Sequence, residues 1–368
     1  MSKKIVGYFG SWSVYRQGAG KFDIDLIDPH LCTHLIYTFV GLNGDDIKVL
    51  DPWQDLPDNG GKNGFGRFNA LKSRNPGLRT LIAIGGWNEG SEKYSVMARN
   101  SGSRGRFVRN AVAFVKKYEF DGLDVDWEYP AQRGGSTSDV QNFVALLREL
   151  RQAFDKESLI LSAAVAAGQT SASQSYDISE ISGHLHFINL MAYDFHGSWD
   201  NRVGLNAPLY ASPRDVGKNA QLTVDAAVKF WLSRGAPAEK LILGTATYGR
   251  SFTLANPNQT QIGDAANGPG LPGPYTAEPG MLGYNEIFEM QQKEEWTVVY
   301  EKYGRAPYAY RGNQWVGYDD VQSIKEKADY IKTAGLGGAM VWSIESDDFT
   351  GKSGEKYPLI KTLNRALL

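Results

Sequence analysis

Three acidic residues occupy alternate positions in one short, otherwise apolar segment of the chain. Residues 121–130 read DGLDVDWEYP, so that Asp124, Asp126 and Glu128 alternate with leucine, valine and tryptophan. On a β-strand, side chains two residues apart project to the same face. Carboxyl groups this close repel one another when ionised, which raises the pKa of at least one of them. A carboxylic acid that keeps its proton near neutral pH suits general acid catalysis, so the segment predicts an acid–base site that ends at Glu128.

A solvated strand end and a metal cluster are the other interpretations of these acids. The large apolar residues between the acids argue against a solvated end. The chain has one cysteine, Cys32, and its five histidines show no HExxH-type spacing. These features argue against a metal site, and we expect neither a metal nor a cofactor.

Eight short apolar runs recur along the chain with helix-like stretches between them. Several runs, such as LIAIGGW and LILGTATYG, are almost continuously apolar, as is typical of parallel strands covered on both faces. The runs span residues 4–12, 34–42, 79–87, 120–128, 159–167, 187–195, 241–249 and 337–344. The helix-like stretches include residues 106–117, 140–157, 224–234, 320–333 and 357–368. This alternation favours an α/β fold, the (β/α)8 TIM barrel, over an open doubly wound sheet.

The connection between the seventh and eighth runs is too long for an ordinary βα loop. Residues 251–316 are rich in glycine, proline, tyrosine and asparagine. The segments EWTVVYE and PYAYRGNQWVGY, in and just after this region, alternate like antiparallel strands. We predict a small α+β insertion domain at 251–316 on the seventh βα loop, and a catalytic barrel formed by 1–250 and 317–368. Because βα loops lie on the catalytic face of such barrels, the insertion should wall one side of the substrate cleft.

Composition restricts the classes of partner. The 368-residue chain has 39 basic and 41 acidic residues and a formal net charge of −2, which argues against a nucleic acid or an anionic membrane as the main partner. No apolar run approaches the ~20 residues of a membrane span, and no signal region follows the charged N-terminus. Nine tryptophans and 19 tyrosines are many for this length. Their rings suit the flat apolar faces and polar rims of sugars, although a tryptophan-rich core would explain them equally well.

The acidic segment resembles the DxxDxDxE signature of the family 18 glycoside hydrolases, the chitinases. Four further segments resemble segments on other strands of that family, in the same order along the chain. They are AIGGW at 83–87, MAYD at 191–194, TYGRSF at 247–252 and AMVWSI at 339–344. The resemblance runs from Ile5 to Leu368 and is strongest to animal-type chitinases, which carry the same α+β insertion.

The resemblance implies a role for each matching residue. Glu128 matches the acid that protonates the leaving glycosidic oxygen. Asp126 matches the carboxylate that orients the N-acetyl group of the substrate, and Asp124 the group that shares a proton with it. Tyr193 matches the hydroxyl that bonds the N-acetyl carbonyl. The substrate-binding matches are Tyr8, Trp12, Phe39, Trp53, Trp87, Met191, Asp194, Trp199, Tyr248, Arg250, Met340 and Trp342. Among them, Trp342 matches the floor of the −1 subsite, and the other four tryptophans resemble aromatic platforms along the cleft.

The resemblance implies hydrolysis of β-1,4 linkages in N-acetylglucosamine polymers. Cleavage would proceed with retention, through an oxazolinium ion that the substrate's own acetamido group forms. The expected partners are chitin or its oligosaccharides, bound by a monomer that takes neither nucleic acid nor membrane. Two alternatives share the fold. A chitin-binding lectin-like protein typically lacks the acid that Glu128 supplies, and an endo-N-acetylglucosaminidase is disfavoured by the tryptophans and the insertion.

The chain departs from the family pattern in two respects. Ala83 stands where the family has a serine, which removes a hydrogen bond to the acid network and should adjust its pKa values. Cys32 has no partner, because Gly7 stands where the first disulfide of animal relatives would close. The cysteines of the second bridge are likewise missing, because position 288 is a phenylalanine and residues 352–356 contain no cysteine. Substrate and family imply a secreted protein, whereas the missing disulfides and signal region argue against an oxidising compartment.

Overall fold

Eight parallel strands close into a barrel in the computed structural model, which describes residues 2–368. Each strand pairs in parallel with the next barrel strand along the chain, and β1 pairs with both β2 and β15, which closes the ring. The strands are β1 (Lys4–Gly10), β2 (His34–Asn43), β4 (Arg79–Gly85), β5 (Gly122–Asp126), β6 (Ile160–Ala166), β7 (Phe187–Met191), β8 (Leu241–Ala246) and β15 (Gly338–Trp342). This ring confirms the predicted (β/α)8 barrel and rules out the open doubly wound sheet.

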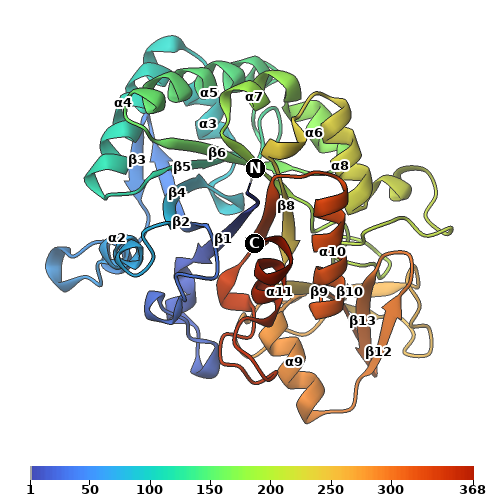
Figure 1. The fold of residues 1–368 in the computed structure, drawn as a ribbon. Helices are drawn as coiled ribbons and strands as arrows, with labels where there is room; N and C mark the ends of the chain where they lie inside the picture. The colour runs from blue at the N-terminus through green and yellow to red at the C-terminus, as the bar shows by residue number, and fades with distance from the viewer. Residues whose placement is uncertain (1) are drawn as a thin grey trace.

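Helices cover the outside of the barrel (Figure 1). The long ones confirm the predicted helical stretches: α4 (Ser101–Lys117), α5 (Asp139–Lys156), α8 (Val224–Ser233), α10 (Val321–Thr333) and α11 (Pro358–Leu367). Shorter elements are α1 (Pro52–Asp55), α2 (Gly64–Asn69), α3 (Glu92–Ala98), α6 (Gln169–Ser175), α7 (Ile178–His184) and the strand β3 (Asp46–Val49), antiparallel to β2. Side-chain caps fix several helix starts; the Thr223 hydroxyl, for example, accepts from the first turn of α8. None of the helices within residues 2–368 has the length and apolarity needed to cross a membrane.

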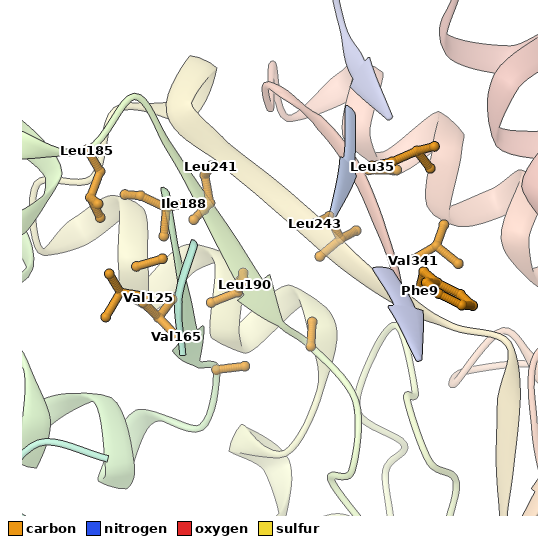
Figure 2. Close-up of a cluster of buried hydrophobic side chains, with 14 of the residues drawn as sticks. Phe9, Leu35, Val125, Val165, Leu185, Ile188, Leu190, Leu241, Leu243 and Val341 are labelled. Atoms are coloured by element: carbon orange, nitrogen blue, oxygen red, sulfur yellow. The ribbon is translucent and has the colours of Figure 1, made fainter. Parts of the chain in front are cut away.

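The barrel strands contribute to two packed layers. One layer lies between the strands and the helices, and Figure 2 labels part of it: Phe9, Leu35, Val125, Val165, Leu185, Ile188, Leu190, Leu241, Leu243 and Val341. Alternate residues, among them Tyr8, Ala83 and Met340, form a second cluster inside the barrel. Successive side chains of a strand point to opposite faces. Because Val125 points outward, its neighbours Asp124 and Asp126 point inward.

A six-stranded sheet follows β8 in the chain and lies beside the barrel, in orange in Figure 1. Its strands are β9 (Tyr248–Leu254), β10 (Ala266–Pro269), β11 (Met281–Gly283), β12 (Thr297–Glu301), β13 (Ala306–Arg311) and β14 (Gln314–Gly317). The helix α9 (Tyr284–Lys293) lies between β11 and β12 in the chain. The antiparallel pairs β12–β13 and β13–β14 confirm the strands expected in EWTVVYE and PYAYRGNQWVGY. A separate small apolar cluster, which includes Phe252 and Trp315, packs this sheet.

This second sheet begins earlier than the sequence indicates. The apolar run 241–249 predicts one strand, but β8 ends at Ala246 and Tyr248 opens β9. Thr247 lies at the break, where its N–H donates to the carbonyl of Trp342 at 3.0 Å. One apolar run thus serves two sheets, which apolarity alone does not reveal. The boundaries of the two domains stay a prediction.

Cys32 lies buried directly against Gly7 of β1. A Cβ atom placed on Gly7 would lie 2.8 Å from Cys32 Sγ, so a cysteine at position 7 would face the thiol, as the family pattern implies. Near the second expected bridge, an ion pair joins α9 to the loop before α11. Lys352 Nζ lies 2.6 Å from an oxygen of Glu289, the residue after Phe288. Secretion stays a prediction.

We predict that Gly7→Cys forms a disulfide with Cys32 and raises the unfolding temperature. A bridge that closes a loop of this length stabilises by about 3 kcal/mol on chain-entropy grounds. Ile344 Cδ1 lies 3.0 Å from the same Cβ position, so a small shift in packing should reduce the gain. Calorimetry with and without reductant measures the effect, and the unaltered chain is the control because its single cysteine cannot form an internal bridge. Two free thiols in the oxidised variant would contradict the prediction.

Candidate active site

The acidic segment of β5 lies as the sequence predicts. Asp124 and Asp126 are buried inside the barrel, and Glu128 follows the end of the strand, half-buried. Trp127 points the other way, where its indole N–H donates to Ser91 Oγ at 2.8 Å. The alternation therefore brings the acids to one side and anchors the strand on the other.

Donors from three other barrel strands hold Asp124. Its carboxyl group accepts from the hydroxyls of Tyr8 and Ser162, each at 2.6 Å, and from the amide of Asn189 at 3.2 Å. Burial raises the pKa of Asp124. A hydrogen bond with Asp126, and then these three hydrogen bonds, oppose the rise because they stabilise the ionised form. Ala83 of β4 and Ser162 of β6 flank Asp124 in register. The hydroxyl that is absent at position 83 is therefore supplied from the opposite neighbouring strand.

Asp126 carries an unpaired oxygen. Its Oδ1 is buried and has no hydrogen-bond partner within residues 2–368. Burial, and then the charge of Asp124, raise the pKa of Asp126 well above its ordinary value. Two adjacent buried carboxyl groups do not both ionise readily, so we infer that the pair keeps one proton near neutral pH. An unpaired buried acceptor is costly, so Oδ1 is suited to a donor that arrives with a ligand.

The surroundings of Glu128 favour its protonated form. Burial raises its pKa to about 7. A hydrogen bond with Tyr129 and the charge of Arg133 act to lower this pKa, and the charge of Asp194 acts to raise it. Arg133 also donates to two backbone carbonyls, that of Trp87 at 2.8 Å and that of Glu128 at 3.0 Å. Its guanidinium carbon lies 3.6 Å from the centre of the Trp87 ring. One arginine thus ties a predicted platform residue to the backbone of the acid.

Two residues at the end of β7 have opposite hydrogen-bonding states. The hydroxyl of Tyr193 contacts Met340 Sδ at 3.7 Å, a weak acceptor, and is therefore available to a ligand. Asp194 is engaged: its Oδ1 accepts from Tyr248 at 2.6 Å and from Arg250 Nε at 2.8 Å. The structure thus brings four predicted residues together beside the acids: Tyr193 and Asp194, which follow β7, and Tyr248 and Arg250 of β9.

Four predicted aromatic residues form one cluster at the site. The ring of Trp342, at the end of β15, lies 5.4 Å from that of Tyr8 and 5.8 Å from that of Phe39. Trp12 lies 6.0 Å from Trp342 and stacks nearly parallel on Phe39. The two predicted methionines belong to the cluster inside the barrel: Met340 is buried in it, and Met191 packs against it.

The three outer tryptophans are solvent-exposed. Trp87 and Trp199 are 57% and 58% exposed, and each lies under an arginine next to the acids. The arginine on Trp199 is Arg250, which also binds the carboxylate beside Tyr193. Trp53, in α1, is 50% exposed but contacts no other aromatic ring of the site within residues 2–368. Its place in the cleft stays a prediction.

Sequence reasoning did not single out Ser162, Asn189 and Arg133. The first two are polar residues in apolar strand runs, at positions where the alternation points inward; that was the available signal. Arg133 lies in the loop after β5, and only its basic charge close to the acid distinguishes it. These three residues adjust the acids without belonging to the signature.

Carboxyl groups, not cavity size, locate the site. Two cavities of about 410 and 510 Å³ lie away from the acids, on either side of Tyr210, and no predicted site residue lines them. In the described part of the chain, no group of three or more histidine, cysteine, aspartate or glutamate side chains is placed to hold a metal ion. The acid pair, Glu128 and the aromatic cluster can instead bind a sugar ring and move a proton.

Comparison with known proteins agrees with this arrangement. The chain matches the profile of Glycosyl hydrolases family 18 over residues 4–347. It is 43% identical to chitotriosidase-1 of Mus musculus over 373 residues, which cover 99% of this chain and 78% of that protein. The structure of a group IV chitinase from Ostrinia furnacalis in complex with allosamidin aligns with a TM-score of 0.96 at 44% identity, over 99% of this chain and 98% of that one.

A relative of a different kind has the same fold. Human YKL-39, described as a pseudo-chitinase with retained chitooligosaccharide binding, aligns with a TM-score of 0.92 at 39% identity over the full length of both chains. The family match and the identity to chitinases hold over nearly the whole chain. The chain therefore belongs to glycosyl hydrolase family 18 and is a glycoside hydrolase of the chitinase type.

Proposed function

We propose that this chain cleaves β-1,4 linkages of N-acetylglucosamine polymers with retention, using the substrate's own acetamido group as the nucleophile. The observation that carries this proposal is the unpaired, buried Oδ1 of Asp126. Close to the acids, the hydroxyl of Tyr193 faces only the sulfur of Met340. An unpaired acceptor and an unengaged donor match the N–H and the carbonyl of one acetamido group.

Glu128 starts the reaction as the acid. With a pKa of about 7, it is substantially protonated near neutral pH and donates its proton to the glycosidic oxygen as the bond from C1 breaks. The acetamido oxygen attacks C1 and forms the oxazolinium ion. Holding the nucleophile within the substrate lowers the barrier by proximity.

The acid pair stabilises the ion that forms. The positive charge spreads onto the acetamido nitrogen, whose N–H donates to Asp126, and the proton shared by the pair then resides on Asp124. In the second step, ionised Glu128 takes a proton from water as the water attacks C1. The bond from C1 to the acetamido oxygen breaks, and the electron pair returns to the acetamido group. Two displacements at C1 return the original configuration.

A carboxylate of the protein is a weaker candidate for the nucleophile. Asp194 is the further acid near Glu128, and its Oδ1 already accepts from Tyr248 and Arg250. Hydrogen bonds to an oxygen that would attack C1 lower its reactivity, because they stabilise the ionised ground state. Asp194 is better suited to shaping the pocket around the acetamido group.

Aromatic rings and the second sheet support a polymeric substrate. Trp342 and its cluster offer a flat floor, and Trp87 and Trp199 offer exposed faces beyond it. Met281 of β11 packs against the inner cluster, which supports a wall of the cleft built by the insertion. Chitin and its oligosaccharides are the partners that fit these surfaces; a monomeric state stays a prediction.

A non-catalytic carbohydrate-binding protein is the second candidate, favoured by one observation. The pseudo-chitinase YKL-39 has nearly the same fold. Glu128 and its raised pKa favour the enzyme, because a protein that only binds sugar has no need of a protonated carboxyl group at this position.

We predict that Glu128→Gln lowers turnover at least ~10²-fold, because the amide cannot donate the proton. Binding of a chitooligosaccharide should persist, because the amide keeps the size of the side chain. Product release under saturating substrate and titration calorimetry measure the two effects. Glu157→Gln, on the exposed surface, is the matched control and should leave turnover unchanged. Turnover in Glu128→Gln near that of the unaltered chain would remove Glu128 from the mechanism.

We predict that the sugar bound next to the acids must carry an acetamido group. A fully deacetylated oligomer, or a cellulose oligomer of equal length, should not be cleaved, because neither supplies the nucleophile. A thiazoline analogue of the oxazolinium ion should inhibit competitively. Reducing-end assays on the matched oligomers measure this requirement. Rapid cleavage of the cellulose oligomer would show that another group attacks C1.

We predict that Ser162→Ala moves the acidic limb of the kcat/KM profile to higher pH by about one unit. The serine hydroxyl stabilises ionised Asp124, so its loss raises the pKa at which the pair gives up its first proton. Activity is then lost at a higher pH as the solution is acidified. Adding Ala83→Ser to this variant places a hydroxyl beside Asp124 on the other flanking strand, β4. This second change should move the acidic limb part of the way back. A shift of the alkaline limb instead would assign the effect to Glu128.

A further inference from the structure

A buried carboxyl group lies beneath the aromatic floor, outside the signature segment. Glu345 belongs to the short 3-10 helix Ile344–Ser346 that follows β15, and its side chain is fully buried. Its Oε2 accepts from the backbone N–H of Gly10 at 3.0 Å, and its Oε1 accepts from the hydroxyl of Ser343. This residue thus joins the end of β1 to the end of β15.

Both partners of Glu345 are chain neighbours of a site indole. Gly10 ends β1 two residues before Trp12, and Ser343 directly follows Trp342. The rings of these two tryptophans lie 6.0 Å apart with an angle of 36° between their planes. One carboxyl group therefore holds the backbone on which each indole of the pair is mounted.

The space around Gly10 shows how tightly this contact is packed. A Cβ atom placed there would lie 2.5 Å from Oε1 of Glu345 and 2.8 Å from Cζ2 of Trp12. The carboxyl group and the indole thus both press against the same Cα atom. A shift of the Glu345 side chain changes the space in which Trp12 rests.

The backbone that carries the second indole is held from two sides. The N–H of Ser343 donates to Thr247 Oγ1 at 2.9 Å, and the N–H of Thr247 donates to the carbonyl of Trp342 at 3.0 Å. Glu345 binds the hydroxyl of the same serine. Thr247 fixes the backbone after Trp342 to the junction of β8 and β9, whereas Glu345 fixes it to β1 near Trp12.

We propose that Glu345 is a positioning residue that fixes the relative orientation of Trp12 and Trp342, and thereby the surface on which the sugar rings of a chitooligosaccharide stack. The saccharide part of this inference rests on the proposed function; the orientation of the two indoles does not. Glu345 touches no substrate and takes no part in proton transfer. Its removal should weaken oligosaccharide binding and leave the pH profile set by Glu128 and the acid pair unmoved.

The test compares Glu345→Ala with a conservative variant and a matched control. Glu345→Gln keeps an acceptor for the N–H of Gly10, and its amide N–H can donate to the Ser343 hydroxyl, which then accepts in place of donating. This variant keeps both contacts and should behave like the unaltered chain. Asp347→Ala removes another fully buried carboxyl group two residues away, which instead accepts from the N–H groups of Leu359 and Ile360 in α11. This control loses stability without touching either indole.

Two measurements report on the indoles and on the sugar. Trp12 and Trp342 are the one tryptophan pair in ring contact within residues 2–368, so their coupling should give an exciton couplet in circular dichroism, assigned with Trp12→Phe and Trp342→Phe. Glu345→Ala should lose this couplet and bind a chitooligosaccharide about five- to tenfold more weakly. Glu345→Gln and Asp347→Ala should keep both.

An unchanged couplet and unchanged affinity in Glu345→Ala would overturn the proposal, as would equal losses in Asp347→Ala. If Glu345→Ala does not fold, Ser343→Ala decides, because it removes the hydroxyl that binds Glu345 after β15 and adds no atom beside either indole. Loss of its couplet would support the proposal, and retention would overturn it. If the unaltered chain shows the couplet but binds no chitooligosaccharide, the proposed function is wrong, whereas the orientation of the two indoles still stands.

Discussion

The burial of two carboxyl groups side by side on one strand is the constraint on which the rest of the site depends. Asp124 and Asp126 lie where the barrel excludes water, so each needs partners for its charge. The barrel supplies donors to the first of them from three strands, through Tyr8, Ser162 and Asn189. It leaves one oxygen of the second unpaired, at a cost of about 1–3 kcal/mol. A ligand with an N–H group in this position recovers that free energy.

The other parts of the site act around this pair. Glu128 stands half-buried after the end of the same strand, and the proposed reaction requires it to reach a glycosidic oxygen from there. Burial raises its pKa, and Tyr129 and Arg133 oppose the rise. Aromatic rings from three other strands lie together beside the acids, and in the proposed function they contribute affinity but no chemistry. In the proposed function, the acid pair and Tyr193 select the acetamido group, and the indoles hold the sugar rings.

Alternation along strands is the part of the fold that the sequence predicts well. The period of two placed the acids on one face of β5 and Trp127 on the other, because parallel strands in a barrel have an inside and an outside. The end of β8 was not predicted, because the chain turns out of the barrel at Thr247, whose partners are distant in the sequence. Ser162 and Glu345 escaped for the same reason: their partners lie on other strands, and register decides which side chains meet. That Ala83 and Ser162 flank Asp124 on opposite sides is visible only once β4, β5 and β6 are aligned.

The configuration of the first product tests the central claim most directly. A short N-acetylglucosamine oligomer is cleaved by the unaltered chain inside the NMR tube, and the anomeric proton signals are followed before mutarotation equilibrates them. Attack by the acetamido oxygen, guided by Asp126, predicts that the β anomer appears first. Initial release of the α anomer would mean that water attacks C1 in a single displacement, and the role given to the unpaired oxygen of Asp126 would be wrong.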